Sequence, residues 1–150
     1  MIEKYRQHFT HLKVARMKGQ NAPHKAVILL AVLELIEFGL LKQNMITISD
    51  DLTDAFSYIW KRYIGESAVF KDDIQQPYWH MKSEPFWTLY HKDGSLARSD
   101  EAKPSLNALK SEYYAVLDDA LYELLKNQTS RAALRVSLIS KYLAQQNEPV

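Results

Sequence analysis

The sequence predicts a mainly α-helical, compact single domain that carries a small antiparallel β-hairpin or meander, in a winged-helix-like arrangement. Apolar residues recur at helical spacing on both sides of a central segment, in residues 2–63 and again in residues 117–143. Between them, residues 75–94 gather aromatic side chains in short runs separated by prolines, which is typical of strands and turns. A chain of 150 residues, of which 47% are hydrophobic, is long enough to bury one core and short for two.

The N-terminal part predicts two helices. The first is amphipathic and ends in the polar residues 18–21. The second begins after Pro23 and covers residues 24–38, where apolar side chains occur on nearly every face, and Gly39 suits its C-cap. A helix that is hydrophobic all round is buried, so we expect this one at the centre of the domain. The apolar positions of the first helix are Ile2, Tyr5, Phe9 and Leu12.

A short strand and a third helix are predicted next. Residues 45–48 are short and β-prone. Ser49 and Asp50 then offer an N-cap for a helix. The buried face of that helix is expected to carry Leu52, Phe56, Ile59, Trp60 and Tyr63.

Three short strands are predicted in the aromatic segment, at residues 78–81, 86–91 and 95–98. Residues 83–85 supply the first turn. Asp93–Gly94 between the second and third strands is a strong signal for a type I′ hairpin turn.

The chain returns to helix after Pro104. One helix is predicted on a leucine stripe, and another over residues 132–143 behind an N-cap at Thr129–Ser130. Residues 145–150 read as a flexible tail, which leaves residues 1–144 as the folded domain. The leucine stripe consists of Leu117, Leu121, Leu124 and Leu125.

Composition narrows the classes of function. The formal net charge is +1, from 19 basic and 18 acidic side chains, so the molecule as a whole does not attract polyanions strongly. A polyanion such as DNA would have to bind a local basic patch. The chain has no cysteine, which excludes disulfides and zinc sites that need sulfur, and fits the cytoplasm. The N-terminus lacks the apolar core of a secretory signal, and the longest apolar run, residues 26–33, is too short to span a bilayer. We therefore expect a cytoplasmic protein with no membrane partner.

Catalytic chemistry finds no support in the residue pattern. The acidic pairs 72–73 and 118–119 resemble solvated loop or helix-start positions, and neither completes a metal site with histidine. With four glycines and no Gly-x-Ser-x-Gly motif, the chain has neither a nucleotide-cradling loop nor a serine elbow. We expect no enzyme activity, no cofactor and no metal. The histidine pairs nearest to ligand spacing are His8–His11 and His80–His91.

The start of the central helix is the first candidate binding site. His24 and Lys25 follow Pro23 at a helix N-terminus, where unpaired backbone N–H groups and the positive dipole end favour an anion such as phosphate. The plainer alternative is that Pro23 starts the helix while His24 and Lys25 only face water.

The aromatic segment is the second candidate. Its rings and prolines make rigid apolar surface, and basic residues that can engage phosphates stand close in sequence. Alternation along strands makes about half of the rings core residues instead. The rings in question are Tyr78, Trp79, Phe86 and Trp87, and the basic residues are Lys71, Lys82, Lys92 and Arg98.

Two separated motifs resemble one known family. Residues 22–31 (APHKAVILLA), followed by residues 77–81 (PYWHM) and 85–89 (PFWTL), are similar to the sulfur-binding domain of modification-dependent HNH restriction endonucleases. The resemblance covers roughly residues 1–143. Those domains bind DNA in which sulfur replaces a non-bridging phosphate oxygen, a phosphorothioate, and bring an attached HNH nuclease to it. The resemblance implies a DNA-binding module, and since no HNH pattern is visible here, a fused or partner HNH nuclease.

The resemblance also implies roles for individual residues. The family's basic pair falls on His24 and Lys25, which would hold the modified phosphate. The family's pocket often has Tyr-Pro and a small residue three positions later, where this chain has Gln76, Pro77 and His80. Tyr78 or Trp79 would then supply the missing apolar wall. Contacts to the DNA groove are expected from Lys82, Ser83, Lys92 and Arg98.

The aromatic segment also fits a function of another class. A winged-helix-like adaptor would use the aromatic hairpin to bind protein or unmodified DNA.

Overall fold

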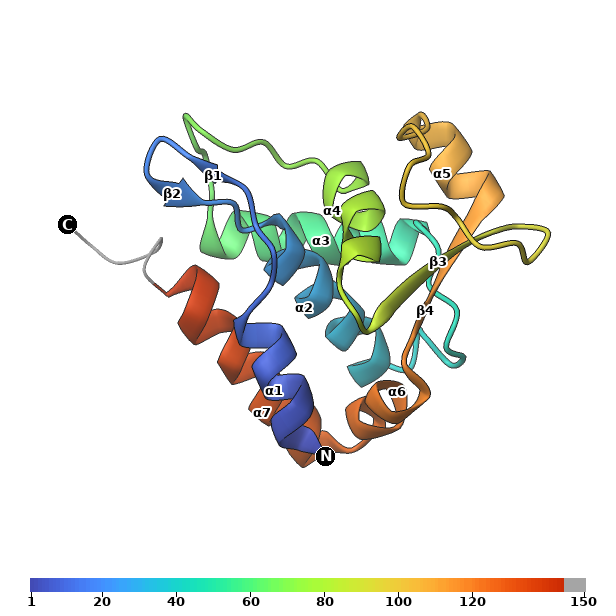
Figure 1. The fold of residues 1–150 in the computed structure, drawn as a ribbon. Coiled ribbons are helices and arrows are strands. Elements are labelled where there is room, and N and C mark those ends of the chain that lie inside the picture. Colours follow the sequence, from blue (N-terminus) through green and yellow to red (C-terminus); the bar gives the residue numbers. More distant parts are fainter. Residues whose placement is uncertain (145–150) are drawn as a thin grey trace.

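Helix α2 (His24–Glu37) runs through the centre of the computed structural model, which describes residues 1–144. It is buried on nearly every face, as its sequence predicts. Helices α3 (Asp50–Tyr63), α4 (Gln75–His80), α6 (Asp119–Lys126) and α7 (Gln128–Leu138) pack around it, and α1 (Ile2–Thr10) packs on α7 (Figure 1). Its N-terminus therefore lies beside α4 and close to the surface, while its C-terminus approaches α6 and α7.

Side-chain caps begin two of the outer helices, α3 and α7. The Ser49 hydroxyl accepts the Leu52 N–H at the start of α3, as predicted. At α7 the cap is Asn127, whose side chain accepts the Ser130 N–H, so the prediction of Thr129–Ser130 as the cap is wrong by two residues. Helix α7 continues into a π-helical turn, η2 (Ile139–Leu143).

The main β element differs from the predicted three-stranded meander. β3 (Trp87–His91) is confirmed, but its antiparallel partner is β4 (Tyr113–Leu117), with Trp87 opposite Leu117. The strands expected at residues 95–98 and 45–48 form only single bridges, Tyr90 to Leu96 and Ile46 to Ala115. β4 was not predicted, because Leu117 stands at helical spacing from the leucines of α6 and was assigned to that helix. In the structure it is the last residue of β4. Helix α5 (Leu106–Glu112) leads into β4.

Residues 78–81 are not a strand. They belong to α4 and to the following 3₁₀ turn η1 (Met81–Ser83), and the neighbouring Tyr78 and Trp79 are both buried. Alternation along a strand would have sent these two rings to opposite faces. In α4 they occupy adjacent positions that both face the interior, and Pro77 is tolerated because it lies in the first helical turn.

A second hairpin, not predicted, joins α1 to α2. β1 (Arg16–Met17) pairs with β2 (Gln20–Asn21) through Lys18 and Gly19, which have φ of 51° and 77°. Two successive positive φ values define the type I′ turn that the sequence placed at Asp93–Gly94 instead. Asp93 lacks a positive φ, and the His91 N–H donates to the Ser95 carbonyl across a longer loop that ends at Gly94.

The predicted fold class, mainly helical with a small antiparallel β element, is confirmed. Within residues 1–144, no helix has the length and apolar character to cross a membrane. The same residues contain no group of three metal-ligating side chains. The tail predicted at residues 145–150 lies outside the described residues.

Candidate nucleic-acid interface

An open cavity of about 570 Å³ lies where the N-terminus of α2 meets α4, the β1–β2 hairpin and residues 69–73. In Figure 1 the hairpin and α4 stand on the same side of the molecule, on either side of this N-terminus. The cavity is lined by Lys13, Val14, Ala15, Met17, Ala22, His24, Lys25, Val69, Phe70, Lys71, Asp73, Gln76, Pro77, His80 and Ser83.

The fold brings most of the predicted site residues to this cavity. Tyr78 and Trp79 do not line it, contrary to the expectation that one of them forms an apolar wall. Tyr78 is 0% exposed and its hydroxyl donates to the Ile46 carbonyl at 2.7 Å, while Trp79 is 3% exposed. Lys82 stands beside the cavity without lining it. The predicted residues that do line it are His24, Lys25, Lys71, Gln76, Pro77, His80 and Ser83.

His24 is fixed in one orientation at the start of α2. Its Nε2 lies 2.7 Å from the Lys71 carbonyl oxygen, and its ring packs against Trp60 with the centroids 4.8 Å apart. A carbonyl only accepts, so Nε2 carries the hydrogen, and in the neutral ring Nδ1 is left as an acceptor. Burial lowers the pKa of His24, against smaller upward effects of the Lys71 carbonyl, Asp73 and Asp72. The free domain therefore holds His24 as a neutral imidazole at pH 7.

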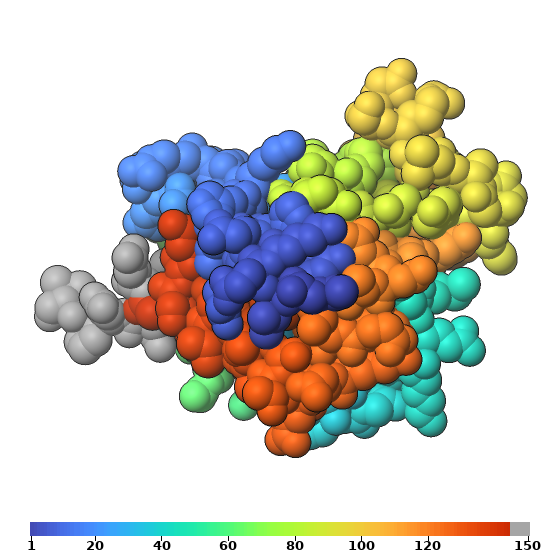
Figure 2. Space-filling model, turned by 60° about the horizontal axis from the view of Figure 1, so that its bottom comes forward, coloured from blue at the N-terminus to red at the C-terminus, as the bar shows by residue number. Residues whose placement is uncertain are grey.

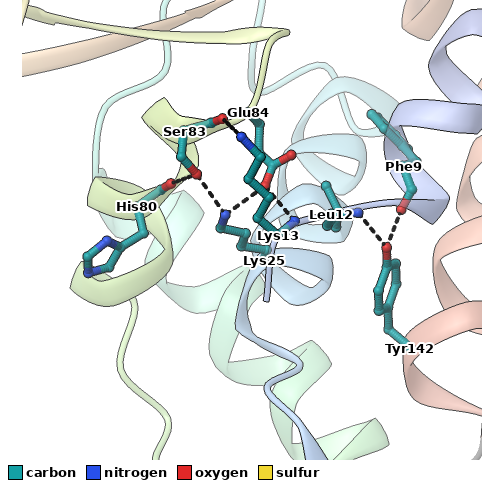
Figure 3. Close-up of polar contacts among 8 residues, drawn as sticks. All are labelled: Phe9, Leu12, Lys13, Lys25, His80, Ser83, Glu84 and Tyr142. Carbon is teal, nitrogen blue, oxygen red and sulfur yellow. Dashed lines mark hydrogen bonds and ion pairs between the residues drawn. The ribbon is translucent and has the colours of Figure 1, made fainter. Parts of the chain in front are cut away.

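Lys25 lines the cavity, but its ammonium is held in a buried ion pair, so its charge is not free to meet a ligand. Its ammonium donates to Glu84 at 2.7 Å and to the Ser83 hydroxyl at 3.1 Å (Figure 3). Lys25 is 7% exposed and Glu84 is 4% exposed. The same Glu84 carboxylate accepts the Lys13 backbone N–H at 2.9 Å. This network ties α2, η1 and the segment before β1 together, so Lys25 shapes the cavity wall.

His80 and Lys82 form the outer rim next to this network. The His80 ring points away from Lys25 in Figure 3 and is exposed. Partial burial, followed by the charges of Lys82, Lys103 and Lys25, lowers the pKa of His80. The Lys82 ammonium lies 3.4 Å above the centroid of the Trp79 ring, which is a cation–π contact. Partial burial also lowers the pKa of Lys82. Trp79 thus acts from the core, by positioning a cation beside the cavity.

Much of the lining was missed by sequence reasoning. The segment before β1 contributes Lys13 and Ala15, β1 contributes Met17, and the α3–α4 connection contributes Val69 and Phe70. These residues lie outside the recognised motifs, a few residues before each of them, and the fold brings both groups to the same cavity. The signal available in the sequence was electrostatic, because residues 4–33 contain no acidic side chain.

One protein-family model matches nearly the whole chain. The family model described as ScoMcrA-like, DNA sulfur-binding domain, matches residues 2–149. The chain belongs to this family. The resemblance predicted from residues 22–31 and 77–89 is therefore confirmed, and this DNA sulfur-binding domain has its cavity at the motifs that carried the resemblance.

Solved structures of two family members share the fold. The sulfur-binding domain of ScoMcrA, complexed with phosphorothioated DNA, is 21% identical with a TM-score of 0.69, over 92% of this chain and 86% of that one. The corresponding domain of SprMcrA, also with phosphorothioated DNA, is 20% identical with a TM-score of 0.66, over 95% and 85%. A ScoMcrA structure that adds an SRA domain matches over 42% of its length. A comparison with curated proteins found no match.

Proposed function

We propose that this DNA sulfur-binding domain recognises double-stranded DNA that carries a phosphorothioate, with the modified phosphate placed in the cavity between the N-terminus of α2 and α4. DNA recognition is assigned to residues 1–144. The observation that carries the proposal is a cavity that combines apolar walls with a helix N-terminus and basic side chains. The family membership and the two relatives bound to phosphorothioated DNA support it.

The apolar part of the cavity suits sulfur. Sulfur is larger, softer and less strongly hydrated than the oxygen it replaces, so contact with Pro77, Phe70 and Val69 costs it less hydration. An oxygen in the same place would lose water for little return. By analogy with other small apolar differences between ligands, such a wall contributes about 1–3 kcal/mol of discrimination.

The polar part of the cavity suits the phosphate charge. The first N–H groups of α2 have no partner within the helix, and His24 stands beside them. Lys13 and Lys71 are exposed on the rim. Lys25 contributes indirectly, since Glu84 neutralises its charge. The formal net charge of +1 limits binding to unmodified DNA, which depends mainly on charge.

The proposal assigns binding and no catalytic step to this chain. Cleavage would come from an HNH nuclease, fused or as a partner, in the cytoplasm. The alternative of an adaptor that binds through aromatic rings loses its basis, because those rings are core residues. Tyr78, Trp79, Phe86 and Trp87 are each no more than 3% exposed.

A paired titration tests the proposed function. A pool of short duplexes, each with and without a single stereodefined phosphorothioate in either configuration, is titrated at near-physiological salt. We expect at least one modified duplex to bind about tenfold more tightly than its unmodified counterpart, in keeping with the discrimination that a small apolar pocket provides. Equal binding of every pair would contradict the proposal.

A further inference from the structure

The β1–β2 hairpin stands outside the core. Residues 15–21 are all exposed, and the hairpin is closed by its own ladder and by the Ala22 N–H, which donates to the Ala15 carbonyl at 2.8 Å. It packs no buried side chain of its own into the domain, although Met17 is a large apolar residue and is 50% exposed. Such an element contributes little to stability, which points to a contact outside the chain.

The hairpin and the arm before it form a basic surface. Lys13, Arg16 and Lys18 follow one another without any acidic residue nearby in sequence. In the part of the chain that the structure describes, none of the three forms an ion pair. The Arg16 guanidinium donates one long hydrogen bond, to the neutral side-chain oxygen of Asn21 at 3.4 Å. A chain with a formal net charge of +1 therefore keeps three uncompensated positive charges at one edge of the cavity.

The two faces of the hairpin carry different chemistry. Met17 lines the cavity, whereas its neighbours Arg16 and Lys18 do not. For Arg16 this follows from the alternation of side chains along β1, which sends successive residues to opposite faces, whereas Lys18 lies in the turn beyond the strand. The apolar member thus faces the place of the modified phosphate, and the cations face outward beyond it.

The position of the hairpin matches an extended partner. In Figure 1 the hairpin, α4 and the loop that precedes α5 stand along one side of the molecule. Figure 2 shows the hairpin (blue) and the segment near residue 100 (yellow) projecting on that side, with the segment near residue 80 (yellow-green) between them. A duplex seated on α4 would reach the hairpin with the nucleotides next to the modified step.

We propose that the β1–β2 hairpin is a second DNA-contacting element, in which Arg16 and Lys18 bind backbone phosphates next to the modified one while Met17 closes the apolar side of the cavity. This inference rests on the proposed function. The two faces of the hairpin have different roles. The cations supply affinity that is independent of sulfur, and Met17 contributes to the preference for sulfur over oxygen.

The salt dependence of binding tests the cations. Each phosphate neutralised on duplex DNA adds about 0.9 to the slope of log affinity against log salt concentration. The double variant Arg16→Ala/Lys18→Ala is expected to lower this slope by about 2 on modified and unmodified duplexes alike, and to leave the ratio of the two affinities unchanged. Lys42→Ala/Lys126→Ala, which removes the same charge from exposed positions away from the cavity, should leave the slope unchanged.

Met17→Ala is expected to do the opposite. The salt slope should stay at the wild-type value, and the ratio of modified to unmodified affinity should fall about three- to fivefold, the effect of roughly one buried methylene. Because all three positions are exposed, the melting temperature of each variant should match that of the wild type.

The inference is overturned if the wild type prefers the modified duplex but the Arg16→Ala/Lys18→Ala variant keeps the wild-type slope. A wild type that binds both duplexes equally would contradict the proposed function instead. The slope measured on unmodified DNA would still decide whether the hairpin contacts phosphates.

Discussion

Replacing Glu84 by alanine is expected to lower the free energy of unfolding by about 3–5 kcal/mol. The substitution leaves the Lys25 ammonium buried, with only the Ser83 hydroxyl at 3.1 Å as a partner. It also removes the acceptor of the Lys13 backbone N–H. Removing one partner of a buried pair leaves an uncompensated charge, which costs more than the net value of the pair itself. Chemical denaturation followed by circular dichroism measures the effect.

A double-mutant cycle isolates the pair from its surroundings. Glu84→Gln keeps an acceptor for the Lys13 N–H, and Lys25→Met keeps the side-chain volume, so the double variant should be more stable than the sum of the single effects predicts, by about 1–3 kcal/mol. The exposed pair Lys126–Glu123 serves as the control, and Glu123→Ala should change stability by less than about 1 kcal/mol. A Glu84→Ala variant as stable as the wild type would mean that Lys25 is hydrated and free to hold the phosphate, as the sequence had predicted.

DNA binding is expected to strengthen as the pH falls from 8 to 5. Nε2 of His24 donates to the Lys71 carbonyl at 2.7 Å, so the ring can donate to a phosphate through Nδ1 only after it takes up a proton. Burial holds the pKa of His24 in the free domain below its usual 6.5, and an anion in the cavity must raise it. The gain begins as the pH falls through the raised pKa of the complex and levels off below the lowered pKa of the free domain. Within that window one proton changes affinity by up to about tenfold per pH unit.

Variants identify which histidine takes up the proton. His24→Gln keeps an N–H that can reach the Lys71 carbonyl but cannot take up a proton. The slope of log affinity against pH should therefore lose the contribution of one proton. His80→Gln measures any separate contribution from the rim, where the pKa of the histidine is also lowered. His11→Gln, at an exposed position that does not line the cavity, should behave as the wild type. Wild-type affinity that does not vary between pH 8 and 5 would show that His24 makes no charged contact with DNA.

The elements that were predicted best are those whose signals lie within a few neighbouring residues of the sequence. Helix α2 needed only a continuous apolar run after Pro23, and α3 needed only the cap at Ser49 and its apolar face. The motifs at residues 22–31 and 77–89 were likewise enough to indicate the family and to bring His24, Pro77 and His80 into one candidate site. All three line the cavity.

Other features were decided by contacts between distant segments. Tyr78 and Trp79 were expected on a strand, but both are buried in α4, where Tyr78 packs edge-on against Trp87 of β3 and Trp79 against Tyr113 of β4. β4 forms because β3, more than twenty residues earlier, supplies its hydrogen bonds. Lys25 was predicted to meet a phosphate because its partner Glu84, 59 residues away, was not visible from the local sequence.

The sequence by itself determined the central helix, the mainly helical class and the family, because apolar periodicity, caps and short motifs act over a few neighbouring residues. Tertiary structure alone decided which rings enter the core, which cation is neutralised and which hairpin borders the cavity. These depend on burial and on charge pairing, and both are set by residues that only folding brings together.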